Sequence, residues 1–457
     1  MSRTVQRKAV INKMKHEKFS YKTLNDLKDK MKELSVDIPL SDKTDVLFDK
    51  VTVGDGWVIP NRFAFQPMEG CDSAEDGSPS DLTLRRYMRF SDSGAGLIWA
   101  EAVAVTPEGR ANPRQLYLTE KNLDSFKKMV EMMKENTFKK YGYEPKVVMQ
   151  ATHSGRYSKP NGFPEPIIAY NNPIFEKDNP IDPSRIITDD EIKRIHECYV
   201  VSSKLAREAG FDGVDVKSCH RYLSSEFLSA YTREGEYGGS FENRTRFLRN
   251  NIASAKTAET KDFIVTSRLN VYDGFEYPYG FGVNEKDGLK PDLTEGVELV
   301  KILHKDYGIN LIDISIGNPY QNPHVNRPYD MGGYVPEEHP LEGVARMMHC
   351  VGEIQKNNPD MVVVGSGFSY LRHYSPLMAA GAVENGVCQV AGYGRETFAY
   401  PMFVQDIKNG GMDERKCCIT CGKCTELMRM GTVAGCVVKD ADPYAKFYKE
   451  AKEKLAK

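Results

Sequence analysis

The sequence of 457 residues contains no apolar run close to the ~20 residues that a membrane-spanning helix requires. Its N-terminus, M-S-R-T-V-Q-R-K, is basic but lacks the apolar stretch of a secretory signal peptide. The net charge of −2 offers no excess of positive charge for nucleic acid or for an anionic membrane. We therefore expect a cytoplasmic protein without a nucleic-acid or membrane partner.

Cysteine usage is uneven along the chain. Five of the ten cysteines are scattered between positions 71 and 388, a distribution that fits a reducing cytoplasm. The first 45 residues are rich in lysine and weakly patterned. We predict that residues 1–45 form a helical or partly disordered extension outside the main core.

Eight short apolar runs, separated by amphipathic stretches, follow this extension. They are rich in Val and Ile without period-2 alternation, which is typical of parallel strands buried on both faces. The expected strands are Arg62–Pro67, Gly96–Ala100, Lys146–Gln150, Gly213–Val216, Phe263–Arg268, Leu311–Ile316, Met361–Gly365 and Val387–Ala391. One helix between them should begin at the capping box Thr188-Asp-Asp-Glu191 and end at Ala209-Gly210.

Eight strands that alternate with helices predict an α/β protein with a (β/α)8 TIM barrel, which we assign to residues 46–410. The rival fold is a doubly wound sheet. No G-x-G-x-x-G follows an expected strand, so the sequence gives no support for a Rossmann unit.

The other five cysteines lie within twenty residues, in the run C-C-I-T-C-G-K-C-T-E-L-M-R-M-G-T-V-A-G-C. Thiolates at two-residue gaps cannot all pair as disulfides, but they can converge on one metal centre. Cys418, Cys421 and Cys424, with Cys436 more distant, follow ferredoxin-type iron–sulfur spacing. A structural zinc, which usually shows two separated C-x2-C pairs, and free thiols are the alternatives. We assign residues 411–457 to a cysteine-rich cluster-binding segment and tail.

A polar loop follows the fourth expected strand and places Lys217, His220 and Tyr222 within six residues. In TIM barrels the active site lies where strands end and loops begin, so these side chains are catalytic candidates. The alternative is a polar loop that satisfies its own backbone.

This loop continues as Y-L-S-S-E-F-L-S and then E-Y-G-G-S-F-E-N-R. The stretch closely resembles the flavin-dependent Old Yellow Enzyme family of NADH:flavin oxidoreductases. It is most similar to the larger branch that includes the iron–sulfur 2,4-dienoyl-CoA reductases. The resemblance runs from about Asn61 to Cys436 and implies an FMN-binding (β/α)8 barrel.

Residues that match the family's flavin contacts follow from this resemblance. It places Pro67, Met68 and Glu69 at the flavin C4 carbonyl edge, and Ala102 beside the ring. It places Gln150 at the pyrimidine and Arg268 at N1, where a fixed cation stabilises reduced flavin. The implied phosphate clamp consists of Gly365, Ser366, Gly367, Gly394 and Arg395, at strand ends where barrels of this type bind phosphate.

The resemblance implies an ene-reductase, in which FMN passes hydride to the β-carbon of an activated alkene and Tyr222 supplies the proton. Lys217 and His220 would hydrogen-bond the substrate carbonyl, or Lys217 would anchor an anionic group. The loop after the sixth strand offers four candidate substrate contacts, unless it is only a proline-stiffened connector. These contacts are Tyr320, His324, Arg327 and Tyr329.

Two departures from the family pattern stand out. Glu69 occupies a position where the family usually has Thr or Cys, and such a carboxylate would lower the flavin potential, stay protonated or pair with a base. The dienoyl-CoA reductases space their ligands C-x2-C-x3-C-x11-C, whereas here the gaps are x2, x2 and x11. Cys417 and Cys418 therefore compete as the first ligand of a 4Fe-4S cluster.

Two rival functions remain open at this stage. One is an amine dehydrogenase of the trimethylamine dehydrogenase type, and the other is a non-redox barrel with structural zinc. The expected electron donor is NAD(P)H at the barrel mouth or a separate ferredoxin or flavoprotein, and a homo-oligomer is left open.

Overall fold

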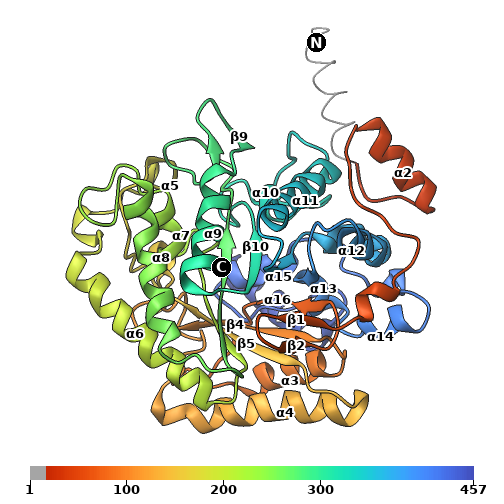
Figure 1. Cartoon of the computed structure of the whole chain (residues 1–457), viewed down its shortest axis with the longest axis horizontal. Helices are drawn as coiled ribbons and strands as arrows, with labels where there is room; N and C mark the ends of the chain where they lie inside the picture. Colours follow the sequence, from red (N-terminus) through yellow and green to blue (C-terminus); the bar gives the residue numbers. More distant parts are fainter. Residues whose placement is uncertain (1–16, 457) are drawn as a thin grey trace.

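A computed structural model describes residues 17–456 of the chain (Figure 1). Eight parallel strands form a closed barrel in the order β10-β11-β12-β3-β4-β5-β6-β7, and β7 pairs with β10 to close it. Their bounds are β3 Phe63–Phe65, β4 Leu97–Ala104, β5 Lys146–Thr152, β6 Gly213–Val216, β7 Ile264–Asn270, β10 Leu311–Ser315, β11 Val362–Gly365 and β12 Val390–Tyr393. The predicted α/β barrel is confirmed.

Most strand boundaries lie within two residues of the expected ones, and two strands differ by more. β4 runs four residues beyond the predicted end at Ala100, with a register shift between Trp99 and Ala102 against β5. β12 begins three residues after Val387, because the backbone N–H of Val387 donates to Ala382 O and closes the preceding helix. Both differences depend on neighbouring elements, which local apolar patterns do not report.

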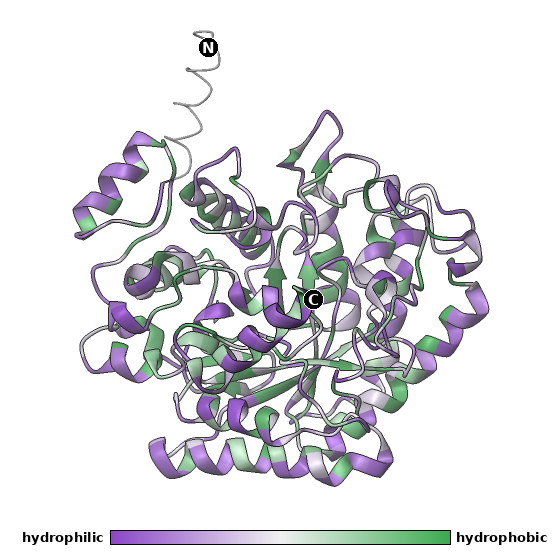
Figure 2. Cartoon of the chain, turned by 180° about the vertical axis from the view of Figure 1, so that it is seen from behind, coloured by the Kyte–Doolittle hydropathy of each residue, from purple (hydrophilic) through white to green (hydrophobic). Residues whose placement is uncertain are grey.

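Helices cover the outside of the barrel, and Figure 2 shows apolar strands in the interior, among helices that carry both hydrophilic and hydrophobic residues. The principal helices are α3 Asp81–Ser91, α4 Leu123–Tyr141, α6 Asp189–Glu208, α8 Phe241–Lys256, α9 Thr294–Tyr307, α11 Pro340–Asn357 and α12 Ser375–Glu384. Shorter ones are α5 Pro173–Glu176, α7 Leu223–Leu228, α10 Pro323–Asn326, α13 Arg395–Ala399 and α14 Phe403–Lys408. Within residues 17–456 no helix is both long and apolar enough to cross a membrane.

Helix α6 forms as its sequence predicts. Thr188 and Glu191 make the reciprocal capping box, and Ile192 and Tyr199 are buried on the face toward the barrel. The helix ends at Glu208, and Gly210 follows with a left-handed φ of 86°.

A hairpin of β1 (Val51–Val53) and β2 (Trp57–Ile59) packs against one end of the barrel interior. Its side chains join an apolar cluster with Leu97, Trp99 and Leu311 from the barrel strands. A second hairpin consists of β8 (Val283–Asn284) and β9 (Asp287–Pro291), between β7 and α9. The first hairpin fills the amino-terminal end of the barrel and leaves the carboxyl ends of the strands for the site.

The expected N-terminal extension packs on the barrel where the structure describes it. It contains α2 (Leu24–Glu33), and Phe19 and Leu27 are part of the main apolar core. The backbone N–H of Phe19 donates to Asp330 Oδ2 at 2.8 Å. Residues 17–45 are therefore joined to the core rather than lying outside it, and residues 1–16 lie outside the described part. The domain boundaries at 45 and 410 remain predictions.

The cysteine-rich segment carries α15 (Lys423–Arg429) and α16 (Ala441–Leu455). Asp440 pairs with Arg85 at 2.7 Å and also with Arg89, both from α3. The backbone N–H of Ala434 donates to Gly70 O at 2.6 Å. These contacts hold the segment against the loops that follow β3, beside the carboxyl ends of the barrel strands.

Candidate functional site

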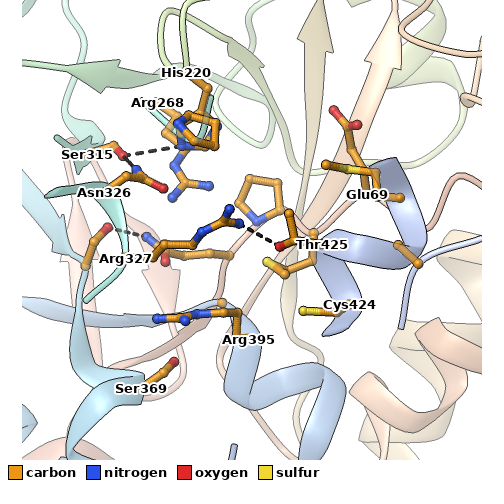
Figure 3. A pocket seen from close by; sticks show the side chains of 18 of the residues that line it. Glu69, His220, Arg268, Ser315, Asn326, Arg327, Ser369, Arg395, Cys424 and Thr425 are labelled. Atoms are coloured by element: carbon orange, nitrogen blue, oxygen red, sulfur yellow. Dashed lines mark hydrogen bonds between the residues drawn. The ribbon is translucent and has the colours of Figure 1, made fainter. Parts of the chain in front are cut away.

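A cavity opens at the carboxyl ends of the barrel strands (Figure 3). Its lining includes residues at the ends of seven strands and residues of the cysteine-rich segment. From the strand ends come Gln66, Gln150, Lys217, Arg268, Ser315, Ser366 and Gly394, and from the segment come Cys424, Thr425, Met428 and Ala434. The geometry of parallel strands thus gathers side chains that are far apart in sequence.

Buried carboxylates behind the cavity fix two of the expected flavin contacts. Asp215 accepts a hydrogen bond from Gln150 Nε2 at 2.7 Å and from Trp99 Nε1 at 2.9 Å. Asp313 lies 3.0 Å from Arg268 Nε. Burial raises the pKa of Asp215 to about 7 and that of Asp313 to about 6. The amide and the guanidinium are held in place before any ligand binds.

Sequence reasoning missed this supporting layer. Gln66 Nε2 donates to Asp313 Oδ1 at 2.8 Å and to Ser366 Oγ at 2.6 Å, which links β3, β10 and β11. The available signal was one acidic residue in each of two apolar strand sequences, Asp215 in V-D-V and Asp313 in I-D-I. A carboxylate in a buried strand needs a polar partner. The partners themselves could not be read from the sequence.

The three catalytic candidates come together at the end of β6. Lys217 and Tyr222 are 4% and 5% exposed, and Tyr222 caps helix α7. His220 and Arg221 both have left-handed φ angles, 61° and 62°, which are costly for residues with a Cβ. Arg221 is tied to Asp273 at 3.6 Å and donates to Tyr170 Oη at 2.6 Å. Buried contacts therefore hold the turn that presents His220 to the cavity.

Glu69 pairs with a base, one of the three roles expected for it. Its Oε1 lies 3.4 Å from Lys217 Nζ and accepts from Tyr222 Oη at 3.3 Å. Lys217 Nζ also sits 3.8 Å from the centre of the Tyr222 ring. Carboxylate, ammonium and phenol form one compact group on one wall of the cavity.

The environment sets the protonation of the other two candidates. Burial, followed by the charges of Arg268 and Lys217, lowers the pKa of His220 well below its ordinary 6.5. Burial, followed by the Glu69 charge, raises the pKa of Tyr222 well above 10. At neutral pH the site therefore presents a neutral imidazole and a protonated phenol, both of which can donate a hydrogen bond.

Other predicted contacts are distributed around the cavity. Pro67, Met68, Gly367 and Arg395 line it, as do Tyr320 and Arg327. Ala102 lies fully buried in β4, and its carbonyl accepts from Gln115 at 3.2 Å. Gly365 faces Cys388, whose Sγ would lie 3.0 Å from an added Cβ. Ala102 and Gly365 are therefore not part of the cavity lining. Tyr329 lines a second cavity beside the first, and His324 contacts Tyr334 and Glu338.

Four thiols gather at a third, smaller cavity, which Cys418, Cys421, Cys424 and Cys436 all line. Cys417 points elsewhere, because its Sγ donates to Asp413 O at 3.5 Å and its side chain belongs to the main apolar core. Among residues 17–456 no group of three or more His, Cys, Asp or Glu side chains is arranged to hold a metal ion.

Comparison with known proteins gives consistent matches. A family described as the NADH:flavin oxidoreductase / NADH oxidase family matches residues 46–332. An NADPH dehydrogenase of Clostridium acetobutylicum is 32% identical over 263 residues, which cover 57% of this chain and 70% of that protein. An NADH oxidase of Thermoanaerobacter brockii is 28% identical over 393 residues, covering 82% of this chain. The chain spans only 52% of that oxidase's length.

Among solved structures, a 2-naphthoyl-CoA reductase in complex with 2-naphthoyl-CoA shares the fold with a TM-score of 0.71. The two are 19% identical, and the match covers 87% of this chain and 57% of the reductase chain. At 19% identity the similarity between the two structures supports a shared fold and no shared activity.

Proposed function

The chain belongs to the NADH:flavin oxidoreductase / NADH oxidase family, and from this premise we propose that it is an FMN-dependent ene-reductase. Its substrate would be an α,β-unsaturated carbonyl compound or an enoate. The observation that carries this proposal is that Tyr222 and His220 both line the strand-end cavity, where the raised pKa of the phenol and the lowered pKa of the imidazole leave one protonated and the other neutral.

The lining of the cavity fits FMN. Gln150 and Arg268 offer an amide and a cation, both fixed by buried carboxylates. Gly367 has a φ of 97°, and an added Cβ at Gly394 would come within 3.3 Å of Met68 Sδ. Such glycines let backbone N–H groups approach a phosphate closely, and Arg395 adds a cation beside them. When bound, FMN would supply the hydride for the β-carbon of the alkene.

The residues of the chain would perform the rest of the reaction. Tyr222 gives its phenolic proton to the α-carbon as general acid, and its raised pKa keeps that proton in place until the carbanion develops. His220 and Lys217 donate hydrogen bonds to the substrate carbonyl, where negative charge accumulates. Because Glu69 pairs with Lys217, the ammonium has a fixed position.

We also propose that Cys418, Cys421, Cys424 and Cys436 hold a 4Fe-4S cluster that relays electrons. Their convergence on one cavity supports this, and Cys424 also lines the proposed flavin cavity. A single zinc ion needs its sulfurs about 3.8 Å apart, given Zn–S bonds near 2.3 Å. The described thiols form neither that set nor another metal-holding group, so the preference for a cluster over zinc rests on the ferredoxin-type spacing. NAD(P)H, or a separate ferredoxin or flavoprotein, would supply the electrons.

The proposal is tested by mixing photoreduced enzyme anaerobically with enones, enoates and enoyl thioesters while the flavin absorbance near 450 nm is followed. We expect at least one alkene class to reoxidise the flavin. Tyr222→Phe should retain flavin reduction but lose about 10²-fold in alkene reduction. If no alkene reoxidises the flavin while an amine reduces the oxidised enzyme, the amine dehydrogenase alternative holds instead.

A further inference from the structure

A second cavity adjoins the first on the side of the cysteine-rich segment. Its volume is about 370 Å³, within the range of about 300–1,000 Å³ typical of small-molecule sites. The two cavities share Tyr320, Arg327, Arg395 and Thr425, so they adjoin at these four residues. Arg429 of α15 lines only the second. A ligand could therefore extend from the proposed reaction site into the second cavity.

Three guanidinium groups have no carboxylate partner among the described residues: Arg327 and Arg395 at the junction, and Arg429 in the second cavity. Arg327 Nη1 donates to Thr425 Oγ1 at 2.7 Å, and Arg429 Nη2 donates to a backbone carbonyl at 2.8 Å. Arg395 Nη2 donates to another carbonyl at 3.2 Å, and Figure 3 shows it beside Arg327. In the part of the chain that the structure describes, none of the three forms an ion pair.

The acidic side chain in the lining of the second cavity, Glu426, is already engaged by other groups. Glu426 lies 3.4 Å from Lys452 and accepts from Tyr448 Oη at 2.6 Å. Burial, followed by the charge of Arg395, lowers the pKa of Arg327 to about 10. A partly buried cation beside a second cation is unfavourable unless an anion joins them.

The other cations of the first cavity are neutralised. Lys217 pairs with Glu69 at 3.4 Å, and Arg268 pairs with Asp313 at 3.0 Å. The excess of positive charge is thus displaced from the reaction site toward the second cavity. In the proposed function Arg395 faces the FMN phosphate. Arg327 and Arg429 remain for a ligand anion, although the proposed cluster ligand Cys421 lines the same second cavity.

An aromatic wall connects the arginines to the proton donor. Tyr320 lines both cavities and stacks on Tyr157, with ring centres 3.8 Å apart. Tyr157 in turn lies 5.9 Å from the Tyr222 ring. An elongated ligand could place an apolar chain along this wall, with one end at Tyr222 and the other at the arginines.

We propose that Arg327 and Arg429 bind a carboxylate or phosphate at the distal end of the alkene substrate, while its activated C=C bond lies against Tyr222. This proposal rests on the proposed function and narrows the substrate to long acyl compounds that carry an anionic group away from the reacting carbonyl. The anion gains charge-assisted hydrogen bonds from the partly buried Arg327 and the exposed Arg429, and such bonds are stronger than those between neutral groups.

The test compares an ω-carboxylate enone, (E)-7-oxooct-5-enoate, with its methyl ester, using photoreduced enzyme so that no nicotinamide donor is present. The concentration dependence of flavin reoxidation gives an apparent Kd for each. We expect the acid to bind at least tenfold more tightly than the ester. Arg429→Gln should weaken the acid about tenfold and Arg327→Gln more strongly, in line with charge-assisted hydrogen bonds.

The matched control is Arg415→Gln. Arg415 lies on the same segment with an 89% exposed side chain that pairs with Asp413, so its loss should leave both Kd values at the wild-type level. Equal binding of acid and ester by the wild type would overturn the inference. Flavin reduction by NADH is measured separately for the same variants. A loss confined to that step would also overturn the inference, because the arginines would then serve the dinucleotide.

A non-reactive probe separates this inference from the proposed function. Saturated 7-oxooctanoate should perturb the absorbance of the oxidised flavin, and the perturbation should weaken in both arginine variants. If this holds while no alkene reoxidises the flavin, the anion site stands and the ene-reductase proposal fails. If alkenes react but the arginine variants bind acid and ester as the wild type does, the anion site fails alone.

Discussion

The pair formed by Glu69 and Lys217 can be tested through stability as well as chemistry. Both side chains are largely buried, with 14% and 4% of their surfaces exposed, and 3.4 Å separates the charged atoms. At an effective dielectric constant near 20, two unit charges at this distance attract by about 5 kcal/mol. Removal of one partner from a buried pair typically costs about 3–5 kcal/mol, because the other charge remains buried and unpaired.

We expect Glu69→Gln and Lys217→Met each to lower the free energy of unfolding by about 3–5 kcal/mol. For a chain of 457 residues the entropy of unfolding is about 1 kcal/mol per kelvin, so each change should lower Tm by about 3–5 °C. The double variant, which removes both charges, should regain most of this loss and melt within about 2 °C of the wild type.

Calorimetry of the four proteins at pH 7.5, each loaded with FMN to the same ratio, measures this cycle. A second readout is the pKa of Tyr222. Because the Glu69 charge helps raise that pKa, Glu69→Gln should lower it, as followed by phenolate absorbance near 295 nm against Tyr222→Phe. If neither single variant changes Tm and the double variant is additive, the pair does not exist in solution, and Glu69 has another role.

Three further predictions concern the cluster, pH and the phosphate loop. Cys418→Ala should lose the bound iron, whereas Cys417→Ala should keep it, because only the Cys418 thiol lines the cavity shared with the other three thiols. If Cys417→Ala loses the iron and Cys418→Ala keeps it, Cys417 is the first ligand of the cluster. Alkene reduction by prereduced enzyme should vary less than about twofold between pH 7 and 9, since the pKa of His220 lies well below this window and that of Tyr222 well above it. An inflection that disappears in His220→Asn would contradict this. Gly367→Ala should cost about 1–3 kcal/mol of stability and release FMN on dialysis. The φ of 97° at this position suits glycine, and an added Cβ would lie 3.0 Å from the Met347 side chain. Unchanged retention of FMN would exclude this loop from the flavin site.

Much of the barrel could be predicted because its signals are local. A buried parallel strand needs a continuous apolar run, and each of the eight runs became a strand. Helix α6 likewise follows from residues within a few positions of its ends. The sequence also predicted that Lys217, His220 and Tyr222 would lie close together, because they fall within six residues at the end of one strand.

The remaining features depend on contacts between distant parts of the chain. Glu69 and Lys217 are 148 positions apart, and Arg327 and Thr425 are 98 apart. No local pattern reports such a pair, because any of several polar side chains could have reached the same place. The docking of Phe19 beside Asp330 was unpredictable for the same reason, with 311 positions between them.

The sequence by itself determined the barrel, the flavin family and the residues offered to the chemistry, since apolar runs and long motifs are properties of neighbours along the chain. Only the tertiary structure decided how those residues are used. Cys417 and Cys418 are adjacent in sequence, yet one thiol is packed in the apolar core and the other lines the cavity of its three companions. Whether a charge is paired, as at Glu69, or left unpaired, as at Arg327, depends on which segments fold against it.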